Sequence, residues 1–446
     1  RLLIVNQREG NRVICIITQV IACSLALVPA EARYGHPACV IIVIYGHNRV
    51  VHGRRSQASG RAPRGCIHSL FSQQKRIAMS RNQDLLDPKV MGDEVTMHAL
   101  FRHLREEDPV SLVEHPDFDP FWAITKHEDI KNISQNNAAF LNNPRTVLVR
   151  KDFEKALLEQ FGTRNGLETL IHMDNPKHRK LRNVTRDWFK PGPIDRLTPQ
   201  VQAIARDYVD KMQEMGGECD FVKDIALLYP LRVIMSIIGV APEEEAMMLK
   251  LTQELFGGQD PTQSRGLEVS DGLGVLMDFF AYFTKVVEDR KANPTGDLAS
   301  LLANALVDGE PMEALDQISY FIITATAGHD TTSATIGGGM KALLEHPDQL
   351  AKLRDNPELA KQAAREMIRW VSPVRHMMRT TTEALELRGK SIPAGDSLCL
   401  WYPSANRDSD VIDNPDTFDI ERDNRNQLAF GYGGHMCLGQ HLAVLE

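Results

Sequence analysis

Residues 430–439 form a glycine-rich loop that carries a cysteine: Phe430-Gly431-Tyr432-Gly433-Gly434-His435-Met436-Cys437-Leu438-Gly439. Three glycines within four positions allow the backbone to lie flat and close against a large neighbour. Because Cys437 leads into an apolar, helix-like segment, its thiolate is expected to face the positive end of a helix dipole, which lowers a thiol pKa and favours metal binding. A lone cysteine is more often a small buried hydrophobe. Here no second cysteine or histidine stands at zinc spacing, so the loop favours a single axial thiolate on iron.

A long helix is predicted over residues 312–346, ending before Pro347. Its middle, 321–326, is apolar or nearly so, as expected of a helix that crosses the centre of a protein. The next residues include poor helix formers and hydroxyl groups that can bend a helix: Ala327-Gly328-His329-Asp330-Thr331-Thr332. A buried helix that is weak at its midpoint indicates a functional site there, although a simple helix end at Gly328 is an equally good interpretation of this segment alone.

The composition is that of a globular protein large enough to bury its own core. The 446 residues are 43% hydrophobic and 25% charged, so neither disulfides nor a structural metal is needed for stability. The formal net charge of −8 gives no cationic field of the kind that attracts nucleic acid. The chain lacks G-x-S-x-G and H-E-x-x-H motifs, so a serine hydrolase or zinc enzyme is set aside.

Residues 1–78 differ from the rest of the chain in charge. They hold eleven Lys and Arg against two acids and therefore carry +9, whereas residues 79–446 carry −17. Because Met79 is the first methionine, residues 1–78 are predicted to be an upstream extension outside the folded domain, which covers 79–446. The alternative is a secretory signal or an anchor at Val13–Ala30, an apolar run interrupted by two polar residues. We expect a cytoplasmic protein without a stable membrane anchor.

Hydrophobic periodicity and turn residues predict a mainly α protein with a small β region, in one large domain. Helices are expected over 95–107, 127–140, 178–190, 194–215, 221–238, 243–256, 349–354 and 357–370, with Pro191-Gly192-Pro193 as a helix stop. Strands are expected over 121–125, 379–383, 385–387 and 397–402. Glu366 and Arg369 share one helix face and can pair, although most such pairs are solvated surface contacts.

Taken together, these motifs resemble those of the cytochrome P450 family. The cysteine loop matches F-G-x-G-x-H-x-C-x-G at each fixed position, and the long helix carries A-G-x-D-T-T. Glu366 and Arg369 match E-x-x-R, and Phe418–Arg422 matches F-D-x-x-R. The resemblance covers about residues 95–446 and implies the cytochrome P450 fold, a haem b cofactor and a monooxygenase that uses O₂.

The resemblance also implies roles for individual residues. Cys437 is implied as the proximal thiolate ligand of the haem iron. Thr331 and Asp330 are implied as the catalytic residues, the first hydrogen-bonding the bound oxygen and the second belonging to its proton relay. Four residues match propionate ligands of the haem, and five more match positions close to the cofactor: His178, Arg182, Arg379 and His435, then Ala327, Gly328, Phe430, Gly431 and Gly439.

Two further groups follow from the same resemblance. One is a largely buried ion network behind the haem, formed by Glu366, Arg369 and Arg422; removing one partner of such a network costs about 3–5 kcal/mol. The other is the substrate pocket, for which the candidates on the long helix are Ile323, Thr326 and Ala327.

Two features depart from the family pattern. Gln427 stands where the family often has histidine, and its amide brings no charge to a haem carboxylate. The chain also ends at Glu446, shortly after the cysteine, so the sequence predicts a C-terminally truncated cytochrome P450 domain.

Within the family, the chain is most similar to the bacterial, soluble type that hydroxylates α-terpineol, through the stretches 217–221, 229–231, 249–256, 403–408 and 435–442. The implied reaction inserts one oxygen atom into a C–H bond of a small hydrophobic substrate, with a monoterpenoid such as terpineol as the first candidate. Alternatives are an alkane, a fatty acid or a steroid, or a non-catalytic haem-binding protein, against which Asp330 and Thr331 argue. Electrons are expected from a 2Fe–2S ferredoxin with its reductase, and its weak candidate contacts are Arg182, Arg186 and His435. A monomer without a nucleic-acid partner is expected.

Overall fold

The computed structural model describes residues 82–446 except 166, 217, 257–264 and 267–268, and it places four short strands nearer the N-terminus. These strands are β1 (Leu2–Ile4), β2 (Arg8–Glu9), β3 (Arg12–Val13) and β4 (Ile42–Ile44). The other residues up to 81 lie outside the described part. An upstream extension over 1–78, or a signal or anchor at Val13–Ala30, therefore stays a prediction. No helix among the described residues is long and apolar enough to cross a membrane.

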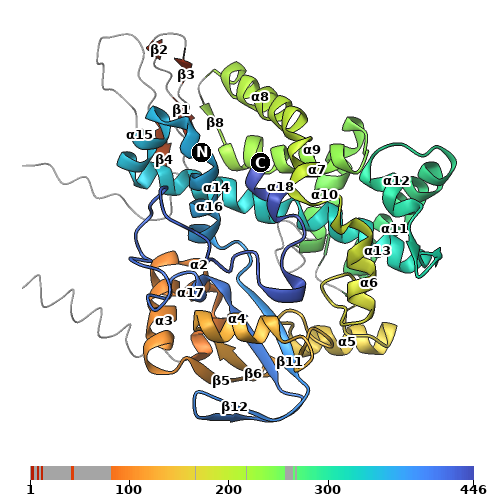
Figure 1. Cartoon of the computed structure of the whole chain (residues 1–446), viewed down its shortest axis with the longest axis vertical. Helices are drawn as coiled ribbons and strands as arrows, with labels where there is room; N and C mark the ends of the chain where they lie inside the picture. Colours follow the sequence, from red (N-terminus) through yellow and green to blue (C-terminus); the bar gives the residue numbers. More distant parts are fainter. Residues whose placement is uncertain are drawn as a thin grey trace, which may run out of the picture.

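Helices make up most of the described chain, and the largest sheet lies at one end of the molecule (Figure 1). The helical elements are η1 (Asn82–Leu86), α2 (Pro88–Gly92), α3 (Glu94–Glu107), α4 (His127–Gln135), α5 (Lys151–Phe161), α6 (Lys177–Arg186), α7 (Pro191–Asp195), α8 (Thr198–Glu214), η2 (Val222–Ala226), α9 (Leu228–Ile237), η3 (Pro242–Glu244), α10 (Glu245–Phe256), α11 (Val269–Ala292), α12 (Leu298–Ala303), α13 (Ala314–Ala327), α14 (Asp330–Glu345), α15 (Pro347–Asp355), η4 (Pro357–Leu359), α16 (Ala360–Val371), α17 (Tyr402–Ala405), η5 (Gly433–His435) and α18 (Gln440–Leu445). The small strands are β8 (Glu218–Cys219), β9 (Leu306–Val307), β10 (Glu310–Pro311), β12 (Leu385–Leu387) and β13 (Lys390–Ile392).

The largest sheet has the strand order β5-β6-β14-β11-β7. Its strands are β5 (Val110–His115), β6 (Phe118–Ile124), β7 (Phe140–Leu141), β11 (His376–Thr381) and β14 (Ser397–Trp401). β14 pairs parallel with β6 and antiparallel with β11, and all five of its residues are buried. Phe101 of α3 packs on Trp401 with ring centroids 5.5 Å apart, within a core that joins α3 to the sheet.

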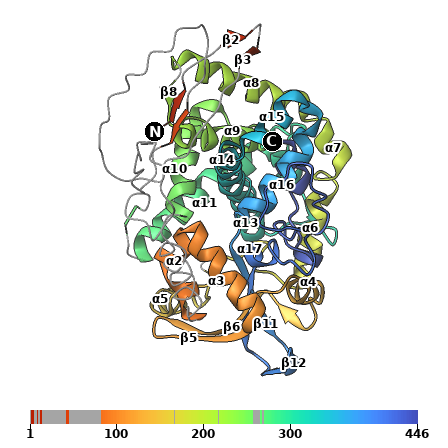
Figure 2. The ribbon, with the colours of Figure 1, turned by 90° about the vertical axis from the view of Figure 1, so that its left-hand side faces the viewer.

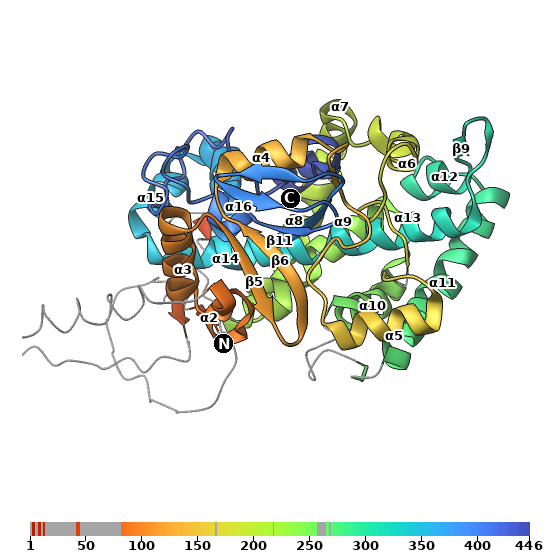
Figure 3. The same ribbon diagram turned by 90° about the horizontal axis from the view of Figure 1, so that it is seen from below.

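The helices α13 and α14 run end to end through the molecule (Figure 3). Phe321 of α13 stacks on Phe283 of α11 with ring centroids 5.2 Å apart, and Phe283 stacks in turn on Phe279. All three rings are fully buried in the main hydrophobic core, which joins α9, α11 and α13. On the other side of the break, α16 lies beside α14 (Figure 2). The helix pair α13–α14 is therefore held from both sides by apolar packing.

The predicted fold class is confirmed, while some predicted boundaries are wrong. The helix expected over 127–140 ends at Gln135, because residues 140–141 pair with β11 as β7. Pro191-Gly192-Pro193 does not simply stop a helix, since α6 already ends at Arg186 and Pro191 begins α7, where proline is well tolerated. Four elements, α5, α11, α12 and β5, are not among those predicted from the sequence. Their apolar patterns are irregular, and their burial depends on neighbours that are distant in sequence.

Candidate active site

The cysteine loop contains η5, leads into α18 and is closed by a backbone hydrogen bond. The N–H of Cys437 donates to the carbonyl oxygen of Phe430 at 2.8 Å. Gly431 and Gly433 have φ values of +69° and +72°, in the left-handed region that favours glycine. A Cβ atom on Gly433 would come within 3.0 Å of the Cα atom of Gln135, at the end of α4. The glycines thus let the loop pack directly on the end of that helix.

The thiol of Cys437 behaves differently from the prediction. Burial raises its pKa, and this outweighs the opposing effects of the Gly439 backbone N–H, which donates to the sulfur, and of the Arg182 charge. The expected lowering by a helix dipole is wrong because α18 begins only at Gln440, so Cys437 lies before the first turn. Deprotonation of this thiol is therefore favoured by a positive partner at the sulfur itself, as in a metal–thiolate bond.

Four basic side chains gather next to the cysteine loop, and we call them the basic cluster: His178 and Arg182 of α6, Arg379 of β11 and His435 of η5. The imidazole rings of His178 and His435 stack with their centroids 3.7 Å apart. The guanidinium group of Arg182 donates to the carbonyl oxygen of Met436, the residue before the cysteine. The structure thus brings together all four predicted propionate ligands.

Among the residues that the structure describes, no member of the basic cluster forms an ion pair, although the charge of Asp174 acts on Arg379 from a distance. Arg379 is only 3% exposed; its Nη1 donates to the Met378 carbonyl oxygen, while its Nε has no hydrogen-bond partner. Burial, together with the charges of Arg182 and Arg379, lowers the pKa of His178 to about 4. Burial and the other three members lower the pKa of His435 to about 2. The buried Nε2 of His178 is also unpartnered, so these residues form a site for anionic groups such as carboxylates.

The helix predicted over 312–346 is interrupted at the expected place. α13 ends at Ala327 and α14 begins at Asp330. Ala327 is exposed although it ends a mostly buried helix, and the hydroxyl of Thr331 donates back to the Ala327 carbonyl oxygen at 3.1 Å. Burial raises the pKa of the neighbouring Asp330 carboxyl group to about 6. The break therefore places a hydroxyl, a carboxyl group that can hold a proton near neutral pH, and a small side chain together.

The three substrate-pocket candidates on α13 lie in different surroundings. Thr326 is 1% exposed, and its hydroxyl donates to the carbonyl oxygen of Ile322 at 2.8 Å. Ile323 is half-buried and packs against the main hydrophobic core. Of the three, only Ala327 is exposed, so the structure brings this one candidate to the face that carries Thr331.

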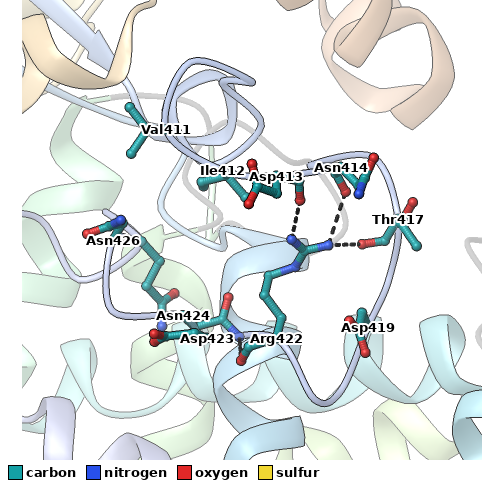
Figure 4. A pocket seen from close by; sticks show the side chains of 11 residues that line it. Val411, Ile412, Asp413, Asn414, Thr417, Asp419, Arg422, Asp423, Asn424 and Asn426 are labelled. Atoms are coloured by element: carbon teal, nitrogen blue, oxygen red, sulfur yellow. Dashed lines mark hydrogen bonds between the residues drawn. The ribbon is translucent and has the colours of Figure 1, made fainter.

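The structure brings together Glu366, Arg369 and Arg422, the three residues of the predicted ion network. Glu366 and Arg369 are both fully buried and form a two-pronged pair, with Nε–Oε2 and Nη2–Oε1 distances of 2.8 and 2.7 Å. Arg422 reaches the same carboxylate at 3.3 Å. Its guanidinium also donates to three backbone carbonyl oxygens, those of Asp413, Asn414 and Thr417 (Figure 4). The Glu366–Arg369 pair is therefore a buried structural contact and not a solvated surface contact.

Asn406, which is not among the residues predicted from the sequence, extends this network. The carbonyl oxygen of Asn406 accepts from Arg369 at 2.9 Å, and its Oδ1 accepts from the backbone N–H of Leu428 at 2.7 Å. Asn406 thereby connects the ion network to the segment that enters the cysteine loop. Its segment, 403–408, is similar to the family but predicts no role for Asn406, because a lone asparagine gives no local sign of such a hydrogen bond.

A cavity of about 460 Å³ opens beside the ion network (Figure 4). Its lining includes Arg422, Asn424 and Gln427, but no member of the basic cluster, nor Cys437 or Asp330. The Oε1 atom of Gln427 is buried without a hydrogen-bond partner. Gln427 thus shares this cavity with Arg422 of the ion network and has an acceptor without a partner.

The weak candidates for a ferredoxin contact differ in accessibility. Arg182 is engaged with the Met436 carbonyl group, and His435 is half-buried in the ring stack. Arg186 is exposed, with its Nε 3.7 Å from a carboxylate oxygen of Asp187. Among these three, Arg186 is the exposed cation that a partner could reach.

Comparisons with known proteins agree with this geometry. Residues 273–446 match the sequence model of the family described as Cytochrome P450. Cytochrome P450-terp of a Pseudomonas species is 38% identical over 369 residues, covering 80% of this chain and 86% of the relative. Linalool 8-monooxygenase of Pseudomonas putida is 32% identical over 367 residues, covering 81% and 89%. The crystal structure of CYP108D1 from Novosphingobium aromaticivorans DSM12444 gives a TM-score of 0.73 at 40% identity, covering 84% of this chain and 88% of that one.

The predicted likeness to bacterial, terpineol-hydroxylating cytochromes P450 is therefore confirmed, and members of that family bind haem through a cysteine thiolate. The residues described above fit this cofactor. Cys437 would supply the thiolate, and the basic cluster would suit the two propionate carboxylates. The unpartnered Arg379 Nε and His178 Nε2 are donors or acceptors that those carboxylates could satisfy.

Proposed function

The chain belongs to the cytochrome P450 family and is a haem-dependent monooxygenase, and we propose that it hydroxylates a monoterpenoid such as terpineol. We propose further that its electrons come from a 2Fe–2S ferredoxin with its reductase, and that it acts in the cytoplasm as a monomer. The single observation that carries the site is the half-buried Cys437 beside four basic side chains that form no ion pair with the described residues. The proposed substrate rests on the likeness to Cytochrome P450-terp and linalool 8-monooxygenase.

The chain's own residues would divide the work of binding and proton delivery. The basic cluster would hold the propionates and Cys437 the iron, and the bound haem supplies the redox centre at which O₂ is cleaved. Hydroxylation consumes O₂, two electrons and two protons and releases water, so protons must reach a pocket that excludes bulk solvent. Asp330, with its raised pKa of about 6, would carry a proton, and the Thr331 hydroxyl would orient it.

Replacing the Thr331 hydroxyl tests this assignment. Thr331→Ala keeps the helix and removes the hydroxyl that would orient the proton, so we expect normal haem content and substrate binding but diversion of electrons to hydrogen peroxide. Positioned proton transfer is worth about 10²–10⁴-fold in rate, so the rate of product formation should decrease by a factor of about 10²–10⁴. Asp330→Asn should slow turnover with less peroxide, because the hydroxyl remains.

Thr335→Ala is the matched control, since the Thr335 hydroxyl makes the same backward bond, to the Thr331 carbonyl oxygen at 2.9 Å. Peroxide and product are measured together per electron consumed. Full coupling in Thr331→Ala, or equal uncoupling in Thr335→Ala, would contradict a role for Thr331.

Substrate class is tested by spectral titration of the haem-loaded protein, followed by product analysis. We expect tight binding and hydroxylation for terpineol and linalool, and weaker binding for an alkane, a fatty acid and a steroid. Tightest binding and turnover of a steroid or a fatty acid would reject the monoterpenoid. Haem loading without hydroxylation of any of these compounds, with a ferredoxin and its reductase present, would reject the proposed activity.

A further inference from the structure

His329 lies in the break between α13 and α14 and is completely buried. Its Nε2 is 2.7 Å from the carbonyl oxygen of Leu227, the residue between η2 and α9. Because a carbonyl oxygen can only accept, Nε2 must carry the hydrogen of this bond. In the neutral imidazole, Nδ1 is then an acceptor with a free lone pair.

That lone pair faces the catalytic carboxyl group. Nδ1 of His329 is 3.3 Å from Oδ1 of Asp330 and is buried with no hydrogen-bond partner of its own. Burial lowers the pKa of His329, which keeps the ring neutral, and raises the pKa of Asp330 to about 6, which favours the protonated acid. A protonated Asp330 can donate a hydrogen bond to Nδ1. An ionised Asp330 in the same place would instead repel Nδ1, because both atoms are acceptors.

We propose that His329 is a positioning residue that holds the protonated Asp330 carboxyl group through Nδ1 while its Nε2–H anchors it to Leu227. This inference rests on the proposed function, because it assigns the proton that Asp330 delivers. The contact keeps the acid both protonated and oriented, so that the proton is available at the break when it is needed. Gly328 supports the arrangement by packing closely on α9: a Cβ atom there would lie 3.1 Å from Ile234.

The surrounding charges leave this pair electrostatically isolated. Neither the pKa of His329 nor that of Asp330 is shifted by a charged group among the described residues; burial acts on both, and the Leu227 carbonyl acts on His329. Charged side chains on the elements around the break have partners elsewhere: Lys223 with Asp220, Asp224 with the Asp220 N–H, Arg232 with Glu245, Asp316 with Lys177, Lys341 with Glu94, and Glu366 with Arg369. The pH response of Asp330 should therefore report on His329.

Two substitutions separate the two nitrogens. His329→Gln can still donate to Leu227 but places no acceptor at the Nδ1 position, whereas His329→Asn keeps an acceptor near Asp330 and loses the Leu227 bond. We expect His329→Gln to retain haem and substrate affinity, to lose about tenfold in kcat, and to shift the pH dependence of kcat to lower pH. His329→Asn should keep the wild-type pH profile, with a lower thermal midpoint.

A double substitution and a spectroscopic titration complete the test. Because His329 acts through Asp330, His329→Gln combined with Asp330→Asn should match Asp330→Asn alone within about twofold in kcat. Infrared titration of the Asp330 carboxyl group, identified by its loss in Asp330→Asn, should give a lower pKa in His329→Gln. His346→Asn, at the far end of α14, is the control and should change neither readout.

The outcomes distinguish this inference from the proposed function. Absence of hydroxylation by the haem-loaded wild type rejects the function, while the infrared titration still decides whether His329 holds the Asp330 proton. A wild-type pH profile and carboxyl pKa in His329→Gln, or multiplicative losses in the double substitution, would overturn the role of His329. Equal pH shifts in the Asn and Gln variants would also overturn it, because the Nδ1 acceptor would then be irrelevant.

Discussion

The ion network and the basic cluster are both buried groups of charged side chains, yet they are built in opposite ways. In the ion network, the Glu366 carboxylate accepts from Arg369 and Arg422, and the remaining guanidinium donors reach backbone carbonyl oxygens. In the basic cluster, two arginines and two histidines face one another, and Arg379 Nε and His178 Nε2 have no partner. The protein alone therefore provides hydrogen-bond partners for the ion network, whereas the basic cluster keeps buried nitrogen atoms without a partner.

This difference separates a residue that stabilises the fold from one that binds a ligand. A paired buried charge lowers the free energy of the folded chain, because its desolvation is compensated inside the protein. An unpaired buried cation raises that free energy, and it is retained only if something outside the chain compensates it. Binding of an anion to the basic cluster therefore removes an unfavourable contribution to the free energy of the folded chain. The ion network, by contrast, holds the segment that enters the cysteine loop.

The largest effect is expected from breaking the ion network. Glu366→Gln keeps the shape of the side chain but leaves two buried guanidinium groups without a negative partner, which should cost about 3–5 kcal/mol of unfolding free energy. Urea unfolding, followed by circular dichroism and by haem absorbance, measures this loss. The control Glu345→Gln removes an exposed partner of Lys341 at 3.5 Å and should cost less than about 1 kcal/mol. Similar midpoints for the two variants would show that the network is not structural.

A smaller effect, with opposite signs in the two states, is expected from the basic cluster. Arg379→Met removes the unpaired charge and keeps most of the volume, so the haem-free protein should gain stability, by about 1 kcal/mol. Haem binding should weaken by about 1.5–3 kcal/mol, or tenfold or more, since a hydrogen bond to a charged group is lost. The pKa values of His178 and His435 should both rise, because Arg379 lowers them.

Unfolding with and without haem, haem transfer to an acceptor protein, and NMR titration of the two imidazoles measure these three changes. Arg354→Met, an exposed arginine 3.2 Å from Asp355, is the control and should leave haem transfer unchanged. A loss of stability in the haem-free Arg379→Met protein would mean that the basic cluster stabilises the fold, as the ion network does.

The same contrast explains what could be predicted from the sequence. Cys437 and the helix break after Ala327 each lie in a motif that is continuous in sequence, so both can be predicted from neighbouring residues. The break occurs where poor helix formers cluster. The stacking of His178 on His435 was not visible, because it depends on how α6 meets the cysteine loop. The predicted direction of the Cys437 pKa shift is wrong for a related reason. Burial, which raises this pKa, is set by tertiary packing, whereas the expected lowering by a helix dipole rests on local sequence alone.

The smallest effect is expected at Gln427, which lines the cavity beside the ion network and leaves its Oε1 without a hydrogen-bond partner. If it faces the haem carboxylate, Gln427→His should strengthen haem retention by less than about fivefold, because the amide already offers a donor and the difference is on the order of 1 kcal/mol. The positive charges of the basic cluster should lower the pKa of the new imidazole, as they do for His178 and His435, so it should stay neutral and the gain should be constant between about pH 6 and pH 8. Haem transfer rates across that range test this, with Gln362→His as the control, since Gln362 donates to the Arg422 carbonyl oxygen on the ion-network side. A gain that grows steeply as the pH falls would place the new histidine outside the field of the basic cluster. No gain at any pH would assign Gln427 to the ion network.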